Sequence, residues 1–102
     1  MDILQPNVVY VGGYTEGVKV AAMAQAYNIP IANGGGWPHH NMHLIAAVAN
    51  GWRVEFHVPM WVTGEMIYRD PPKPSRGTVT LTEQPGLGLT PNEEALKETQ
   101  KS

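Results

Sequence analysis

The sequence predicts an α/β fold, in which parallel strands alternate with helices as they do in part of a (β/α) barrel. A short apolar strand over residues 7–11 leads into a glycine turn and an amphipathic helix, and a second strand over residues 29–32 follows at once. Short loops in a strand-helix-strand order are typical of parallel sheets. The same order continues with a helix over residues 39–48 and a strand over residues 52–57.

The first helix and the strand after it show where the core should lie. The helix stops near Asn28, and its small alanines permit close packing on a sheet. The neighbouring positions are Val18, Ala21, Ala22, Gln25 and Ala26, of which Val18, Ala22 and Ala26 recur every four residues. The strand over residues 29–32 is nearly all apolar, as strands buried on both faces are. Both features favour a helix that packs closely on a parallel sheet.

The second half of the chain begins regularly and then changes character. Pro38 suits the first position of a helix. From Pro59 onward prolines and glycines interrupt the pattern. There we expect an extended segment, a strand, a turn and a terminal helix, over residues 71–74, 78–82, 85–89 and 91–97 respectively. We therefore divide the chain into barrel units over residues 1–58 and a C-terminal extension over residues 59–102.

Length and charge exclude several classes of protein. A complete eight-stranded barrel needs about 250 residues, so 102 residues supply at most its last third. The net charge of −2 and the 16% of charged residues give no basic surface for nucleic acid or for a membrane. Because the chain has no cysteine, no signal pattern and no apolar stretch of membrane-spanning length, we expect a cytoplasmic protein.

Polar residues stand where each predicted strand ends, at Asn7, Asn33 and Glu55. In (β/α) barrels the carboxyl ends of the strands form the floor of the active site. Glu55 is a candidate catalytic residue by its place at a strand end, and the alternative is a strand carboxylate that pairs with Arg53 or another base. Asn7 and Asn33 are candidate substrate contacts, and Asn7 is equally well explained as a structural asparagine at its strand end.

The loop after the second strand carries the remaining candidates. Trp37 either walls a substrate pocket or covers the end of the barrel. His39 and His40 follow the glycines of residues 34–36, which place them near the strand ends. His39 and His43 lie four residues apart on one helical face, but no Glu or Cys completes a metal site. The glycines lack the Lys-Ser/Thr of a phosphate-binding loop.

Four segments together resemble one known family. They are Gln-Pro-Asn with Gly-Gly-x-Thr-Glu, the small-residue helix with Asn-Ile-Pro-Ile, His-Leu-x-Ala-Ala and Val-Glu-Phe, at residues 5–16, 28–31, 43–47 and 54–56. In this order and spacing they are similar to the C-terminal part of the mandelate racemase/muconate lactonizing enzyme family, within the enolase superfamily. The Pro-Gly-Leu-Gly-Leu turn and its short helix also resemble the usual ending of that family.

The resemblance implies a fold and a chemistry. Members of the family have a capping domain and a (β/α)7β barrel of the TIM type, bind Mg²⁺ through carboxylates on the third to fifth strands, and abstract a proton α to a carboxylate. This chain would supply strands six to eight and a tail that packs on the capping domain. The Mg²⁺ ligands would lie outside the chain, so no metal ligand is assigned here. Glu55 matches the acid of the eighth strand.

Two departures from the family pattern concern the catalytic base. Asn7 stands where one branch has Asp and another has Lys, and Asn33 or Gly34 stands where a His is expected. An amide is no general base near neutral pH. The base would then come from the second strand, upstream of Met1, or from His39 or His40.

We therefore expect part of a Mg²⁺-dependent enzyme that acts on a hydroxy acid, with dehydration of a sugar acid as the leading reaction. A histidine of the 37–40 loop would help the β-hydroxyl to leave. Racemisation, epimerisation and cycloisomerisation are alternatives, and the particular substrate stays open. We expect the isolated chain, with Met1 at a truncation, to be inactive and to form homo-oligomers through open strand edges. The alternative from a different functional class is a small, non-catalytic binding or self-associating module.

Overall fold

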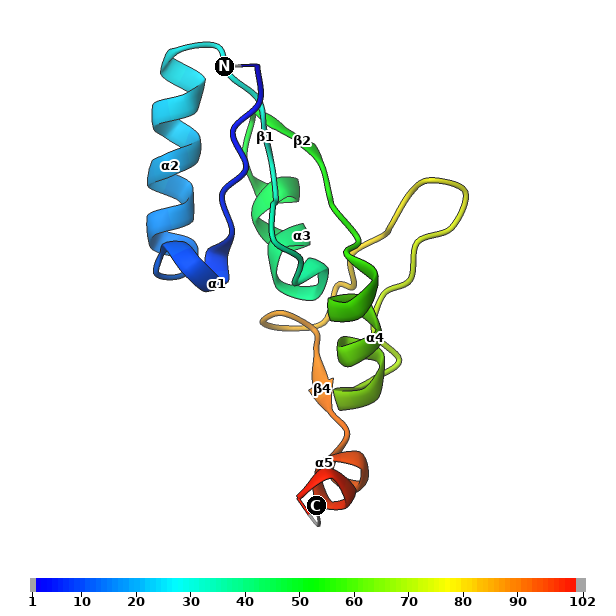
Figure 1. Cartoon of the computed structure of the whole chain (residues 1–102). Coiled ribbons are helices and arrows are strands. Elements are labelled where there is room, and N and C mark those ends of the chain that lie inside the picture. The colour runs from blue at the N-terminus through cyan, green and yellow to red at the C-terminus, as the bar shows by residue number, and fades with distance from the viewer. Residues whose placement is uncertain (1, 101–102) are drawn as a thin grey trace.

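The computed structural model describes residues 2–100, except for the side chain of residue 99. The expected truncation at Met1 lies outside these residues. The elements along the chain are α1 (Val8–Val11), α2 (Tyr14–Ala26), β1 (Ile31–Ala32), α3 (Pro38–Ala47), β2 (Gly51–Arg53), α4 (Val58–Ile67), β3 (Tyr68–Arg69), β4 (Thr90–Pro91) and α5 (Glu93–Thr99). Figure 1 shows that the parallel strands and α1–α3 form one part, and that α4 to α5 form a second part below it.

Three parallel segments form the sheet of the first part. β1 pairs in parallel with β2, and Leu4 makes a parallel bridge with Ile31. The amide of Leu4 donates to the carbonyl of Pro30, and the amide of Ala32 donates to the carbonyl of Leu4, both at 3.1 Å. Helices α1 and α2 connect the Leu4 segment to β1, and α3 connects β1 to β2. The predicted alternation of parallel strands and helices is therefore confirmed.

The predicted strand over residues 7–11 is wrong, because the parallel segment lies earlier, at Leu4, and residues 8–11 form α1. Valines and a tyrosine favour a strand locally. Here two caps favour a short helix instead. The side chain of Asn7 accepts from the amide of Val9, and Gly12 closes the helix in the left-handed conformation with φ of 101°.

The buried face of α2 also differs from the prediction. The buried residues are Gly17, Ala21 and Ala24, whereas Val18 is 49% exposed. A Cβ added to Gly17 would lie 3.0 Å from the side chain of Leu44, so only the smallest side chains fit where α2 approaches α3. Of the predicted positions Ala21 is therefore on the buried face, whereas the stripe of Val18, Ala22 and Ala26 is exposed.

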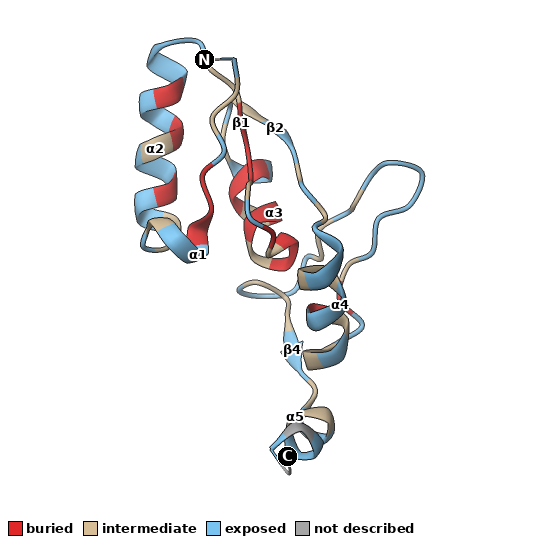
Figure 2. Ribbon diagram, in the orientation of Figure 1, coloured by how far each residue is buried: buried red, intermediate tan, exposed pale blue. Residues whose placement is uncertain are grey.

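The hydrophobic core lies between α2, α3 and β1, where Figure 2 shows the buried residues concentrated. Ile31 of β1 is fully buried, as its place in the middle of the sheet requires. The core cluster consists of Val8, Ala21, Ala24, Ile31, Leu44 and Ile45. This part of the chain therefore has a core of its own, and it holds the ends of the three parallel segments in fixed positions.

The second part contains three elements that the sequence did not predict, α4, β3 and β4, and lacks one that it did. α4 follows β2 directly and had no predicted counterpart. The strand predicted over residues 78–82 is wrong, since its only ladder contact is an antiparallel bridge between Ser75 and Thr78. The terminal helix is confirmed as α5, which begins at Glu93 after an Asn92 cap. β3 directly follows α4 and β4 comes shortly before α5, and the two strands form a short antiparallel pair.

The two parts meet where the parallel strands end, as Figure 1 shows for α3 and α4. Gly64 of α4 lies against the ring of His39. The hydroxyl of Tyr68 in β3 lies 3.1 Å from Nε2 of His40. The second part therefore lies beside the carboxyl ends of the strands, and its position is fixed by glycine and aromatic contacts.

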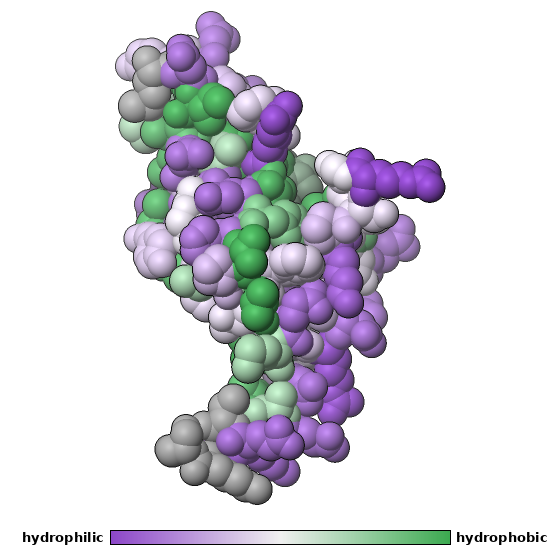
Figure 3. All heavy atoms as spheres, turned by 45° about the vertical axis from the view of Figure 1, so that its right-hand side comes forward, coloured by the Kyte–Doolittle hydropathy of each residue, from purple (hydrophilic) through white to green (hydrophobic). Residues whose placement is uncertain are grey.

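Apolar side chains also reach the surface. Val18, Met23 and Tyr27 of α2 or its end are 49%, 68% and 76% exposed, and Met66 of α4 is 55% exposed. Figure 3 shows apolar residues on the face turned toward the viewer, in the upper part and again further down. Within residues 2–100, no helix combines the length and the apolar character needed to cross a membrane.

Candidate active site at the strand ends

The ends of β1 and β2 are joined by one buried asparagine. Asn33 directly follows β1, and its Oδ1 accepts a hydrogen bond of 2.7 Å from the amide of Glu55. Its Nδ2 donates to the carbonyl of Glu55 at 3.3 Å. Since Asn33 is fully buried, these bonds are protected from water and fix the backbone that carries Glu55.

The end of the first parallel segment is joined to the glycine loop by Asn7. Nδ2 of Asn7 donates to the carbonyls of Gly34 and Gly36, at 2.7 and 3.2 Å. Its Oδ1 accepts from the amide of Val9 at 3.0 Å. Asn7 is 4% exposed, so in this chain its amide serves both as a helix cap and as an anchor for the loop.

A third asparagine, Asn41 of α3, completes this arrangement, and the sequence reasoning missed it. Its Nδ2 donates to Oδ1 of Asn7 at 3.0 Å and to the carbonyl of Gly36 at 3.2 Å. Its Oδ1 accepts from the amide of Val8 at 2.9 Å. Asn41 is fully buried. No local signal in the sequence marks Asn41, because it lies in a polar run with His39, His40 and His43.

We call Asn7, Asn33 and Asn41 the asparagine cluster. All three donate to one acceptor, the carbonyl oxygen of Gly36, at 3.2, 3.3 and 3.2 Å. The cluster therefore joins the ends of all three parallel segments to the loop before α3. A fully satisfied buried network of this kind makes the local structure rigid.

The loop needs glycine at the point where the cluster holds it. Gly36 has φ of 85°, and a Cβ added there would lie 2.6 Å from the side chain of Met60 in α4. Trp37 follows with φ of 58° and is the N-cap residue of α3. The amide of Gly36 donates to Oε2 of Glu55 at 3.3 Å. The loop therefore contacts the carboxylate directly.

Glu55 is the carboxylate that this arrangement presents to solvent. It is exposed, while the asparagines behind it are buried. The alternative pairing with Arg53 gains no support, because the guanidinium of Arg53 lies over the ring of Trp52, 4.4 Å from its centre. The hydrogen bond from the Gly36 amide helps to orient the side chain of Glu55.

The two candidate histidines lie in different surroundings. His39 is fully buried against Gly64, and neither ring nitrogen has a hydrogen-bond partner among the described residues. Burial, and then the neighbouring His40, lower the pKa of His39 below its ordinary value of 6.5. His39 therefore packs between α3 and α4 and does not line the exposed surface beside Glu55.

His40 is partly exposed and belongs to a group of aromatic residues. Its ring lies edge-on to Trp37 with centres 6.0 Å apart, and its Nε2 lies 3.1 Å from the hydroxyl of Tyr68. Burial lowers the pKa of His40, and the nearby His43 lowers it further. Tyr14 donates to the carbonyl of His40 at 2.7 Å, and burial raises the pKa of Tyr14 to about 12. His40 therefore contacts both the ring of Trp37 and the hydroxyl of Tyr68.

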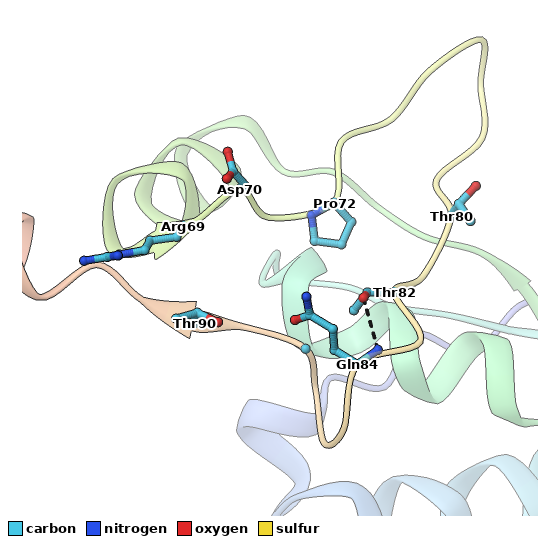
Figure 4. Close-up of a pocket in the computed structure, with 8 residues that line it drawn as sticks. Arg69, Asp70, Pro72, Thr80, Thr82, Gln84 and Thr90 are labelled. Carbon is cyan, nitrogen blue, oxygen red and sulfur yellow. Dashed lines mark hydrogen bonds between the residues drawn. The ribbon is translucent and has the colours of Figure 1, made fainter.

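The residues present do not by themselves fit a Mg²⁺ site. Among residues 2–100 no three His, Cys, Asp or Glu side chains lie close enough together to hold a metal ion. Mg²⁺ prefers several oxygen ligands, and Glu55 is the one carboxylate in the arrangement described above. A cleft of about 370 Å³ between β3, β4 and the loop before β4 is lined by residues such as Arg69, Thr82 and Thr90 (Figure 4). Neither Glu55 nor the asparagine cluster lines this cleft.

Comparison with known proteins decides the family. Residues 1–95 match the family described as enolase C-terminal domain-like. The chain belongs to this family. An L-rhamnonate dehydratase of Saccharopolyspora erythraea is 32% identical over 106 residues, which cover 91% of this chain and 25% of that protein. The chain spans about a quarter of the length of the curated relatives it matches.

Solved structures agree with this assignment. A mandelate racemase/muconate lactonizing enzyme from a marine actinobacterium, in complex with magnesium, is 27% identical with a TM-score of 0.82, over 96% of this chain and 28% of that one. An L-rhamnonate dehydratase from Gibberella zeae is 29% identical with a TM-score of 0.79, over 96% of this chain and 27% of that one. The α/β fold is thus that of the enolase C-terminal barrel, and the predicted family is confirmed.

Proposed function

We propose that this chain forms part of the substrate-binding site of an acid-sugar dehydratase of the enolase superfamily. The observation that carries the proposal is the convergence of three strand ends on Glu55 through Asn33 and the Gly36 amide. The curated relatives named as dehydratases of rhamnonate, arabinonate and gluconate support sugar acids as the substrate class.

Glu55 is the residue that we propose to contact the substrate. Dehydration of a 2,3-dihydroxy acid removes the α-proton, breaks the bond from the β-carbon to its hydroxyl, and releases water. The resulting enol then becomes a 2-keto acid. Negative charge grows on the substrate carboxylate as the α-proton leaves, and a protonated Glu55 can donate a hydrogen bond to it. An ionised Glu55 would repel the same oxygen.

The other predicted site residues receive different proposed roles. Asn7 and Asn33 have their amides occupied inside the chain, so we assign them to the floor beneath the substrate. Trp37 would form one wall. His40 is the proposed acid for the departing β-hydroxyl. Its Nδ1 is buried, so the proton would come from Nε2, which lies 3.1 Å from the hydroxyl of Tyr68, whereas the enclosed His39 serves packing.

The remaining parts of the enzyme would come from outside this chain. We propose that the three parallel segments are strands six to eight of a (β/α)7β barrel, and that the tail after residue 58 packs on a capping domain. The general base and the Mg²⁺ ligands would lie on other strands. The isolated chain should accordingly have no dehydratase activity.

The experiment that tests the function uses the longer protein of which this chain would be part. It is incubated in D₂O with Mg²⁺ and a panel of sugar acids, such as rhamnonate, arabinonate, gluconate, xylonate and galactonate, and the α-proton and products are followed by NMR. We expect a 2-keto-3-deoxy acid from at least one substrate. An epimer without water loss would support the racemase alternative. Retention of the α-proton in every hydroxy acid tested would contradict the proposal.

A further inference from the structure

We propose that Asn41 is a positioning residue that holds the glycine loop and, through it, the side chain of Glu55. Its consequence for turnover rests on the proposed function, because it assumes that Glu55 contacts the substrate. The positioning itself is a property of this chain and is tested on this chain.

The contacts of Asn41 show that its side chain is fully committed to this task. Its oxygen accepts from the amide of Val8, and its nitrogen donates to Asn7, Gly36 and Trp37 at 3.0, 3.2 and 3.0 Å. One fully buried amide thus joins the end of the first parallel segment to the loop and to the start of α3. A buried amide left without such partners costs about 1–3 kcal/mol, so the side chain and the loop hold each other in place.

The contacts of the loop show what Asn41 positions. The peptide between Gly35 and Gly36 carries the amide that donates to Glu55. The peptides before and after it are both anchored, since Asn7 binds the carbonyl of Gly34 and the asparagine cluster binds the carbonyl of Gly36. Glycine adopts many backbone conformations, so without these anchors the amide would have no fixed direction.

Asn41 acts on both anchors. It binds the Gly36 carbonyl directly, and its bond to Oδ1 of Asn7 fixes the direction in which the Asn7 amide points. Asn33 holds the backbone of Glu55, whereas the Gly36 amide contacts its carboxylate. Loss of Asn41 should therefore weaken the hold on the side chain of Glu55, because only Asn7 and Asn33 then bind the Gly36 carbonyl, and it should leave the backbone of Glu55 in place.

The test uses the ¹⁵N-labelled chain and the NMR resonance of the Gly36 amide. In the chain with Asn41, Glu55→Gln should move this resonance, because the carboxyl acceptor is replaced by a carboxamide. In an Asn41→Ala background the same substitution should move it less, because only Asn7 and Asn33 then bind the Gly36 carbonyl. A Gly36 resonance that responds to Glu55→Gln equally in both backgrounds would overturn the proposal.

Asn50→Ala is the matched control. Asn50 also donates to two backbone carbonyls, those of Ala21 and Ile29 at 2.9 and 3.0 Å, but it lies at the other end of the sheet, before β2. The substitution Asn50→Ala should lower the stability of the chain but keep the response of the Gly36 resonance to Glu55→Gln. A reduced response in Asn50→Ala as well would show a general loosening and would count against Asn41.

A second measurement decides the matter if Asn41→Ala does not fold. In the unsubstituted chain the side-chain amide protons of Asn41 should exchange with solvent at least about 100-fold more slowly than those of the exposed Asn28. Equal exchange would mean that the Asn41 bonds are not maintained, and the proposal would fail. Both measurements are independent of turnover, so their failure is distinct from a failure of the proposed dehydratase function.

Discussion

Replacing Gly64 by alanine tests whether α4 packs on His39 beside the strand ends. A Cβ added at Gly64 would lie 2.6 Å from Nε2 of His39 and closer still to two other atoms of the ring. Real Cβ atoms do not tolerate such an approach, and the fully buried ring has little room to move. The helix would have to shift away from α3, or the ring would have to leave its site.

The expected cost follows from two opposing effects. An alanine in place of a helical glycine stabilises a helix by about 1 kcal/mol. Overpacking of a buried site costs about 1–3 kcal/mol, and so close an approach belongs at the upper end of that range. We expect Gly64→Ala to lower the free energy of unfolding by about 2 kcal/mol, as the difference between these two effects.

Gly17→Ala in α2 is the matched control. Its added Cβ would meet the tip of Leu44 at 3.0 Å, where a flexible side chain can adjust. The free energies of unfolding are measured by urea denaturation, followed by circular dichroism. A double variant with His39→Ala should recover part of the loss as a favourable coupling energy. Equal stability of Gly64→Ala and Gly17→Ala would refute the packing of α4 on His39.

Three further predictions concern pH, the asparagine cluster and association. Because burial lowers the pKa of His39 and His40 below 6.5, the unfolded chain binds more protons than the folded one in acid, so the free energy of unfolding should fall as the pH decreases below about 6.5. Denaturation at pH 7.5 and 5.5 checks this, and His39→Leu should weaken the dependence. Asn7→Asp should cost roughly 2–3 kcal/mol of stability, because a carboxylate oxygen would face the carbonyls of Gly34 and Gly36; an unchanged denaturation midpoint would contradict the assigned anchor. Light scattering should give a mass above the 11.2 kDa of one chain, since the Leu4 segment and β2 have unpaired outer edges in the described sheet. A stable monomer would count against the open edges.

The alternation of parallel strands and helices could be predicted because it depends on local signals. Pro38 at the start of α3 and Asn28 after α2 mark helix boundaries in the sequence itself. α4 could not be predicted in this way. It contains several β-branched residues and Gly64, which lower helix propensity, and its contacts with His39 and Gly36 come from residues distant in sequence. In α1 two caps prevailed over the strand preference of valine.

The candidate site was predicted in part for the same reason. Polar residues at strand ends are visible in the sequence, which is how Asn7, Asn33 and Glu55 were chosen. Asn41 was missed because its bonds to Val8 and Asn7 span 33 and 34 residues. His39 illustrates the opposite case. Its nearness to the glycine loop suggested a place at the strand ends, but the direction of its side chain depends on α4.

The most direct test of the central claim is the turnover of the longer protein with Glu55→Ala, measured on the sugar acid that the wild-type protein dehydrates. Alanine removes the hydrogen-bond donor, and because Glu55 is exposed the melting temperature should change little. If Glu55 contacts the substrate while the substrate loses its α-proton, kcat should fall by about 10²–10³-fold. A kcat equal to that of the wild type would contradict the account of this site.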